Sequence, residues 1–126
     1  MFKHEPIDLG YNDLTTTNKG GRKYQTPNGD YPSITTVLGK LSKKAIMEWR
    51  DRVGHDVANE ISRRAAGRGT AVHAVCENYV NNDPDYAKDL MPNILHDFKR
   101  IKNILDTRIG TVYGQELLLY SDHLKV

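Results

Sequence analysis

Apolar residues recur at intervals of three and four through the middle of this chain, and that spacing predicts α-helices. The longest pattern covers residues 57–79, and the segment Asn81-Asn82-Asp83-Pro84 ends it. A second pattern covers residues 92–109 and begins at a proline, which suits the first turn of a helix. A shorter one covers residues 43–53 and is followed by Gly54, a residue typical of helix ends. Together these patterns predict a helix-dominated fold.

The residues before these helices have the composition of turns and short strands. The pair Asn28-Gly29 favours the positive φ angles of a hairpin turn, so we expect a hairpin here. Ser33 suits the N-cap of a short helix that we expect to end at Gly39. Residues 1–21 carry no regular pattern and predict an irregular N-terminal arm. Residues 22–110 therefore hold the predicted hairpin and helices.

The pattern changes at residues 111–120, where β-branched, aromatic and leucine side chains fall on both faces. Such a run predicts a strand covered on both sides, which we expect to be the first core strand of a sheet. A strand of this kind needs neighbours. Either a partner completes the sheet or the sequence is the front part of something longer. If nothing covers the strand, we expect self-association through its exposed edge.

The length and composition limit the class of protein. A chain of 126 residues predicts a single domain, 1–126, and 38% hydrophobic with 27% charged residues is a globular rather than a disordered composition. The sequence has no run of about 18 apolar residues and no secretory signal, so we expect no membrane partner. Its one cysteine, Cys76, cannot form an internal disulfide, which favours a cytoplasmic location.

Positive charge is concentrated in the middle of the chain. The formal net charge is +2, yet residues 40–68 hold eight basic and four acidic residues, which leaves the remainder at −2. The basic residues are Lys40, Lys43, Lys44, Arg50, Arg52, Arg63, Arg64 and Arg68. This excess fits either a surface that faces phosphates or a solvated helical face.

His73 is the first candidate for a chemical role. At about 100° per residue, Gly69, His73 and Cys76 lie close to one line on a helix, and the imidazole leans back over Gly69 and Thr70. Small residues there leave room for a strand, a metal or a phosphate to approach the ring. The alternative is a histidine at the edge of the core, hydrogen-bonded to a nearby carbonyl.

Three further residues near these patterns also have two interpretations. Cys76 is either a buried packing residue or a nucleophile, and Glu77 either orients the imidazole or forms a surface pair. Glu116 shares a strand face with apolar residues, where a carboxylate is costly unless a cation or donor meets it. The alternative is an edge glutamate that reaches water.

From about residue 31 onward, the chain resembles the opening half of RecB-like exonucleases of the PD-(D/E)XK nuclease superfamily. The matching segments are Tyr31–Leu38, Trp49–Gly54, Ala58–Ile61, Arg68–His73 with Glu77, and Gln115–Leu117. The element Arg-Gly-Thr-x-x-His is the most specific of them. The resemblance implies an α+β, helix-dominated fold equivalent to the N-terminal portion of a restriction-endonuclease-like core.

The resemblance also implies a metal-dependent DNA exonuclease acting on single-stranded DNA or DNA ends. His73 matches a catalytic ligand of Mg²⁺ or Mn²⁺, and Glu116 matches a catalytic-strand glutamate near the active centre. The family's later Asp and its (D/E)-x-Lys pair do not occur in these 126 residues, and Asp122-x-x-Lys125 has neither their spacing nor their position. Because that chemistry needs carboxylates to hold the cation and a lysine to help activate water, we expect these 126 residues to be inactive.

DNA-contact candidates come from the same helices. Arg63 and Thr70 fall in a column beside His73, whereas Arg68 turns toward the site only if the glycines break the helix. Lys43 and Lys44 begin the preceding helix and are phosphate-contact candidates. The alternative function is a non-catalytic helical module that binds DNA or another protein.

Overall fold

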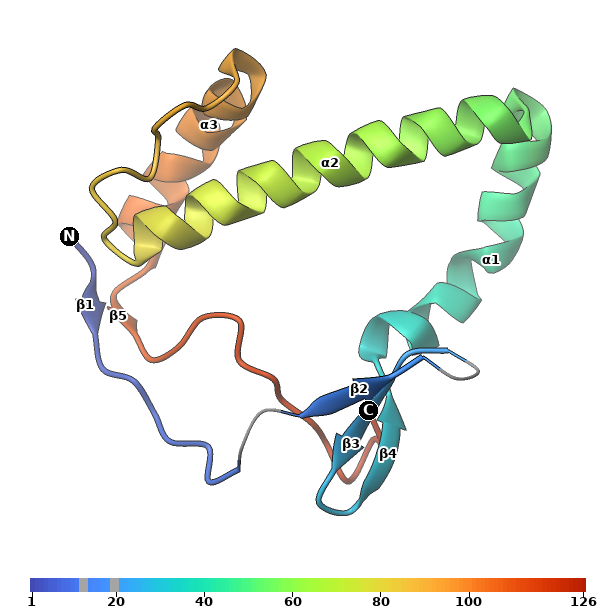
Figure 1. Cartoon of the computed structure of the whole chain (residues 1–126), viewed down its shortest axis with the longest axis horizontal. Helices are drawn as coiled ribbons and strands as arrows, with labels where there is room; N and C mark the ends of the chain where they lie inside the picture. Colours follow the sequence, from blue (N-terminus) through green and yellow to red (C-terminus); the bar gives the residue numbers. More distant parts are fainter. Residues whose placement is uncertain (12–13, 19–20) are drawn as a thin grey trace. The chain divides into compact units, whose positions relative to one another are not determined.

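The computed structural model describes residues 1–11, 14–18 and 21–126. The protein is α+β: its helices are α1 (Ile34–Val53), α2 (His55–Val80) and α3 (Pro92–Arg108) (Figure 1). Its strands are β1 (Lys3–His4), β2 (Thr15–Thr17), β3 (Lys23–Thr26), β4 (Gly29–Pro32) and β5 (Thr111–Val112). Contacts divide the described chain into two compact units. The helical unit comprises Met1–Ile7 and Asp56–Gln115, and the hairpin unit comprises Asp8–His55 and Glu116–Val126.

The core of the helical unit lies between α2 and α3. Val75, Ile94 and Phe98 are buried there, and Phe98 is only 1% exposed. The ring of Tyr79 packs edge-on against Phe98 at 5.3 Å and Tyr86 at 4.8 Å, measured between ring centroids. Both predicted helices are confirmed, and the predicted apolar face of 92–109 supplies this core. Of the face predicted over 57–79, only the C-terminal part packs against the core, because Val57 and Ile61 are 53% and 46% exposed.

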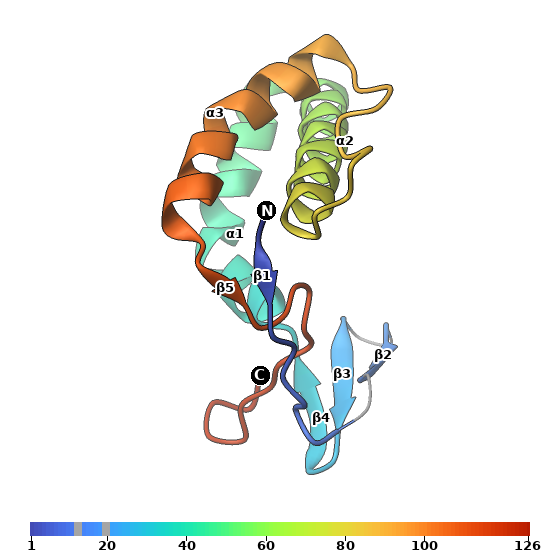
Figure 2. The same ribbon diagram turned by 90° about the vertical axis from the view of Figure 1, so that its left-hand side faces the viewer.

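Strands β1 and β5 form a parallel pair in the helical unit, and Figures 1 and 2 show them side by side. Lys3 is paired with Thr111 and His4 with Val112. The N–H of Phe2 donates to Asn82 Oδ1 at 2.7 Å, and Asn82 Nδ2 donates back to the Phe2 carbonyl at 2.9 Å. These bonds tie the N-terminus to the end of α2.

The prediction of an irregular arm over 1–21 is wrong in part. Strands β1 and β2 lie within it, while residues 12–13 and 19–20 lie outside the described residues. The arm forms strands because long-range partners supply the hydrogen bonds: β1 pairs with β5, and β2 pairs with β3. Its local sequence carries no signal of either partner.

The hairpin unit is built on the antiparallel sheet β2-β3-β4. The predicted hairpin is confirmed: β3 and β4 are joined through residues 27–28, and Gly29 has a φ of 147°. Tyr31 on β4 is buried, and its hydroxyl donates to Asp122 Oδ1 at 2.7 Å. Asn28 Nδ2 donates to the other oxygen of Asp122 at 2.9 Å. The C-terminal segment is thus fastened to the hairpin through Asp122.

Helix α1 is a single helix, so the prediction of two helices separated at Gly39 is wrong. The predicted ends are right: Ser33 is the N-cap and accepts the Thr36 N–H at 3.1 Å, and Gly54 is the C-cap with a φ of 91°. Gly39 lies inside the helix. A glycine in a helix interior costs about 1 kcal/mol, which is too little to end a helix that is well capped.

The prediction of a core strand over 111–120 is also wrong, because only Thr111–Val112 forms strand β5. Glu116 has a φ of +52°, a left-handed conformation that a strand cannot contain. Beyond it, Leu117 and Leu119 are 41% and 69% exposed, so this run is not covered on both faces. The surface predicted for self-association is accordingly not a ten-residue strand edge.

Among the described residues, no helix is long and apolar enough to cross a bilayer.

Candidate functional site

Helix α2 presents most of the predicted site residues of the helical unit. It runs without interruption from His55 to Val80, so Gly67 and Gly69 do not break it. A Cβ built on either glycine meets no atom within 4 Å outside its own stretch of helix. His73 is exposed on this helix rather than sealed in the core. The open space expected over the glycines is therefore present.

His73 lines an open groove of about 870 Å³ between α2 and α3. Helix α2 contributes Arg68, Val72, His73 and Cys76 to it, and α3 contributes Asp97, Arg100, Ile101 and Ile104. We expected a regular helix to turn Arg68 away from His73. Arg68 and His73 are about 140° apart around the axis of α2. Both nevertheless border the groove, because the groove is wide enough to reach both side chains.

Arg68 and Asp97 form the strongest polar contact of the groove. Arg68 Nε donates to Asp97 Oδ2 at 2.5 Å, and Nη2 donates to Oδ1 at 2.7 Å. The hydrogen bonds from the guanidinium hold the pKa of Asp97 below its ordinary value, and the same bonds raise the pKa of Arg68. The pair therefore stays charged and links α2 to α3 across the mouth of the groove.

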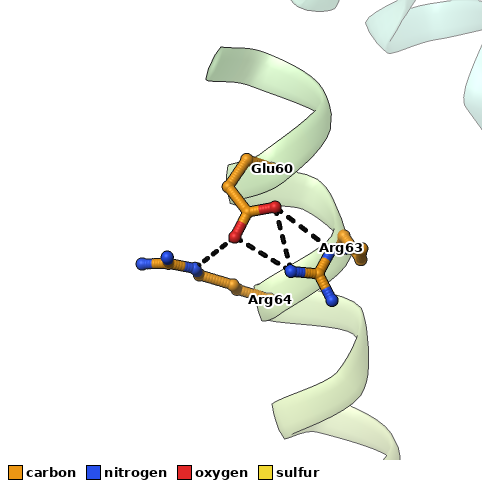
Figure 3. A network of polar contacts seen from close by, with 3 residues as sticks. All are labelled: Glu60, Arg63 and Arg64. Carbon is orange, nitrogen blue, oxygen red and sulfur yellow. Dashed lines mark hydrogen bonds and ion pairs between the residues drawn. The ribbon is translucent and has the colours of Figure 1, made fainter. Parts of the chain in front are cut away.

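The predicted DNA contact Arg63 is part of a different network. Glu60 accepts hydrogen bonds from Arg63 and from Arg64, one turn further along α2 (Figure 3). Arg64 Nε lies 2.6 Å from Glu60 Oε1, and Arg63 Nη2 lies 3.0 Å from Glu60 Oε2. One carboxylate thus offsets part of the positive charge that the sequence concentrates here. Thr70 is exposed on the same helix.

Lys43 and Lys44 lie in the hairpin unit, on α1. They fall in the middle of the helix and not at its start, because α1 begins at Ile34. Lys44 Nζ is 3.9 Å from Glu48 Oε1, and the Lys44 side chain is 90% exposed. Such an exposed pair contributes little to stability, so both lysines are solvated side chains of α1.

The predicted catalytic pair, His73 and Glu116, is divided between the two units. Glu116 is exposed in the hairpin unit, and its neighbour Gln115 donates to Asn81 Oδ1 at 2.6 Å. Within residues 1–11, 14–18 and 21–126, no three His, Cys, Asp or Glu side chains are grouped closely enough to hold a metal ion. The groove itself offers His73 and one carboxylate, Asp97, which Arg68 already binds. These residues alone do not complete a site for Mg²⁺, which prefers several oxygen ligands.

Cys76 and Glu77 follow His73 on α2. Cys76 is half-buried against the core, and burial raises the pKa of its thiol. A protonated thiol is a poor nucleophile, so its surroundings favour the packing role. Glu77 is half-buried, and its backbone carbonyl lies 3.5 Å from Gln115 Nε2.

Sequence reasoning missed Asp97 and Arg100. Both lie on α3 at helical spacing with Ile101 and Ile104, so one stripe of α3 carries two charges beside two isoleucines. That mixture was the available signal, because a face that only packs in the core would not carry an aspartate and an arginine. The prediction considered the apolar positions of this helix alone.

No protein-family model, curated protein sequence or solved structure matches this chain.

Proposed function

We propose that this chain is the N-terminal part of a metal-dependent DNA exonuclease, in which α2 presents His73 to Mg²⁺ or Mn²⁺. The observation that supports this most is the position of the imidazole. His73 is exposed at the border of an open groove, one turn after a glycine with free space above it. A histidine that only packs in the core would not need that space.

The described residues account for only part of the chemistry. When bound, a divalent cation polarises the phosphodiester and stabilises its developing charge. His73 would supply one nitrogen ligand, and the carboxylate ligands and a lysine would have to be supplied in addition. Arg68 and Arg100 border the same groove and would attract the phosphate backbone. These 126 residues therefore supply a DNA-facing surface and one ligand, and we expect them not to cleave DNA.

Two measurements test the proposal. The chain is incubated with end-labelled single-stranded and duplex DNA in Mg²⁺ or Mn²⁺, and we expect no released nucleotide. In parallel, Mn²⁺ is titrated into chain with ¹⁵N-labelled histidine, and we expect paramagnetic broadening of the His73 ring signals before those of His96 on α3. The variant His73→Ala should leave the broadening of the His96 ring signals unchanged, because that ring is not the proposed ligand. Broadening that favours His96, or none at either ring, would end the metal-ligand role of His73.

A non-catalytic DNA-binding module is the second candidate. It is favoured by the absence of a metal-binding group among the described residues, together with the two arginines that line the groove. If DNA binds equally well in EDTA and in Mn²⁺, and His73 shows no broadening, this second function is the better account.

A further inference from the structure

Three aromatic rings and one carboxylate line a small pocket where α2 ends. The rings belong to Phe2, Tyr79 and Tyr86, and the carboxylate belongs to Asp83. The pocket has a volume of about 230 Å³, and all four residues are half-buried. None of the four borders the groove that contains His73, so the pocket is a separate feature of the helical unit.

The three rings stand at steep angles to one another. The planes of Phe2 and Tyr79 meet at 87° with their centroids 5.3 Å apart, and those of Tyr79 and Tyr86 meet at 62°. Lys102 Nζ lies 4.9 Å from the centroid of Tyr79, so this ring already accepts one cation. The face of an aromatic ring carries a partial negative charge, and rings that surround a pocket therefore attract a cation into it.

Hydrogen bonds and core contacts hold the walls of the pocket in place. The Tyr79 hydroxyl donates to Asp106 Oδ1 at 2.6 Å. The N–H and the carbonyl of Phe2 are both bonded to the side chain of Asn82, at 2.7 Å and 2.9 Å. Tyr86 packs against the core of the helical unit. Because these walls are ordered before a ligand arrives, binding costs less conformational entropy.

Asp83 adds a negative charge to this pocket. Its Oδ1 accepts the Asp85 N–H at 2.9 Å, and no basic group in the described part of the chain forms an ion pair with its carboxylate. The segment 81–91 around it holds three aspartates and one lysine, a net charge of −2. The pocket therefore favours a positively charged ligand.

The cations beside the pocket interact with a different carboxylate, that of Asp106. Lys102 Nζ lies 2.7 Å from Asp106 Oδ2, and this hydrogen bond lowers the pKa of Asp106. The charge of the Met1 α-amino group acts on Asp106 in the same direction. Asp83 is thus the carboxylate left to meet a bound cation.

We propose that this pocket binds a trimethylammonium group, which lies over the rings of Phe2, Tyr79 and Tyr86 with its charge beside Asp83. An unmethylated ammonium has three N–H donors, and burying them against aromatic rings would leave them without acceptors. A trimethylammonium group has no donor to lose, and its methyl groups bury apolar surface while its charge attracts the rings. Both choline-type small molecules and trimethylated lysine side chains carry this group. The proposal does not depend on the nuclease function.

The test is a titration of choline into the ¹⁵N-labelled chain in EDTA, followed by amide chemical shifts and calorimetry. We expect the largest shift changes at residues 1–5 and 78–87, which surround the pocket. The matched ligand is 3,3-dimethylbutan-1-ol, whose neutral tert-butyl group has the shape of the trimethylammonium group. We expect it to bind about tenfold more weakly than choline, because it keeps the apolar contacts and lacks the charge.

Two pairs of variants separate the charge from the ring. Asp83→Asn keeps an acceptor for the Asp85 N–H and should weaken choline binding about tenfold. Asp85→Asn removes the same charge from an exposed residue outside the pocket, and we expect less than a twofold change. Tyr86→Leu should weaken binding about tenfold, whereas Tyr86→Phe keeps the ring and should change binding less than twofold. Circular dichroism at 222 nm checks that each variant is folded.

A trimethyllysine peptide and its unmodified form identify the source of the group. Tighter binding of the trimethylated peptide than of choline indicates a methylated lysine, and the reverse order indicates a small molecule. The proposal is overturned if choline and its neutral analogue bind equally, if Asp83→Asn and Asp85→Asn lose equally, or if the two peptides bind equally. Absence of binding by both choline and the trimethylated peptide also overturns it. The analogue and Asp83 comparisons stand even if Tyr86→Leu fails to fold.

Discussion

Replacing Gly69 by alanine should stabilise this protein. Gly69 lies inside α2, and a Cβ there meets no atom within 4 Å beyond its own stretch of helix. Glycine in a helix interior is less favourable than alanine by about 1 kcal/mol, partly because the unfolded chain loses conformational freedom when a Cβ is present. With no clash to offset this gain, we expect Gly69→Ala to raise the free energy of unfolding by about 1 kcal/mol. For a unit of this size that corresponds to a rise in Tm of about 4–8 °C.

Thermal and urea unfolding followed by circular dichroism at 222 nm measure the effect. Gly54→Ala is the matched control, because Gly54 has a φ of 91° and the same added methyl group should lower stability by about 1 kcal/mol. Gly67→Ala should behave like Gly69→Ala, since the space above it is also open. If Gly67→Ala is stabilising while Gly69→Ala is neutral or destabilising, something occupies the surface over Gly69, and the reasoning from open space is refuted.

Three further perturbations test the fold. Phe98→Ala removes the most buried ring of the helical core and should cost about 3–5 kcal/mol in urea unfolding, whereas Leu119→Ala, 69% exposed, should change stability by less than about 0.5 kcal/mol. Because the pKa of Asp97 is lowered in the folded chain, its contribution to stability is complete above the ordinary aspartate pKa of about 3.9 and is lost as the pH falls through the lowered folded value. Asp97→Asn should therefore flatten that part of the unfolding-versus-pH curve, and an unchanged curve would contradict the role of the Arg68 pair. Ser33→Ala should cost about 1 kcal/mol through loss of the α1 cap, and Ser33→Asp should restore it.

Local patterns account for the elements that were predicted correctly. Helix α3 and the C-terminal part of α2 bury apolar residues at the predicted spacing, whereas Val57 and Ile61 near the start of α2 are exposed. The ends of α1 lie at the serine and glycine expected for an N-cap and a C-cap. The hairpin lies where Asn28-Gly29 predicted it. Each of these features depends on interactions within a few residues, so the sequence carries the whole signal.

Two of the failed predictions, the strand over 111–120 and the irregular arm, involved partners distant in the chain. Residues 111–120 have strand composition, but a strand also needs a neighbour along its length, and β1 supplies one only at Thr111–Val112. Part of the arm predicted to be irregular forms strands β1 and β2, because β5 pairs with β1 and β3 pairs with β2. Strand propensity describes how well a residue fits a sheet, and it does not determine whether a sheet is present.

The sequence by itself determined helices α2 and α3, the two ends of α1 and the placement of an imidazole beside glycines on α2, because helical periodicity repeats within one turn of the backbone. Only the tertiary structure decided which charges share a surface. Arg63 is held by Glu60, whereas Arg68 crosses to Asp97 on α3, and the difference depends on which helix packs beside α2. The groove that His73, Arg68 and Arg100 border exists because α2 and α3 pack through Val75 and Phe98, residues separated by more than twenty positions in the chain.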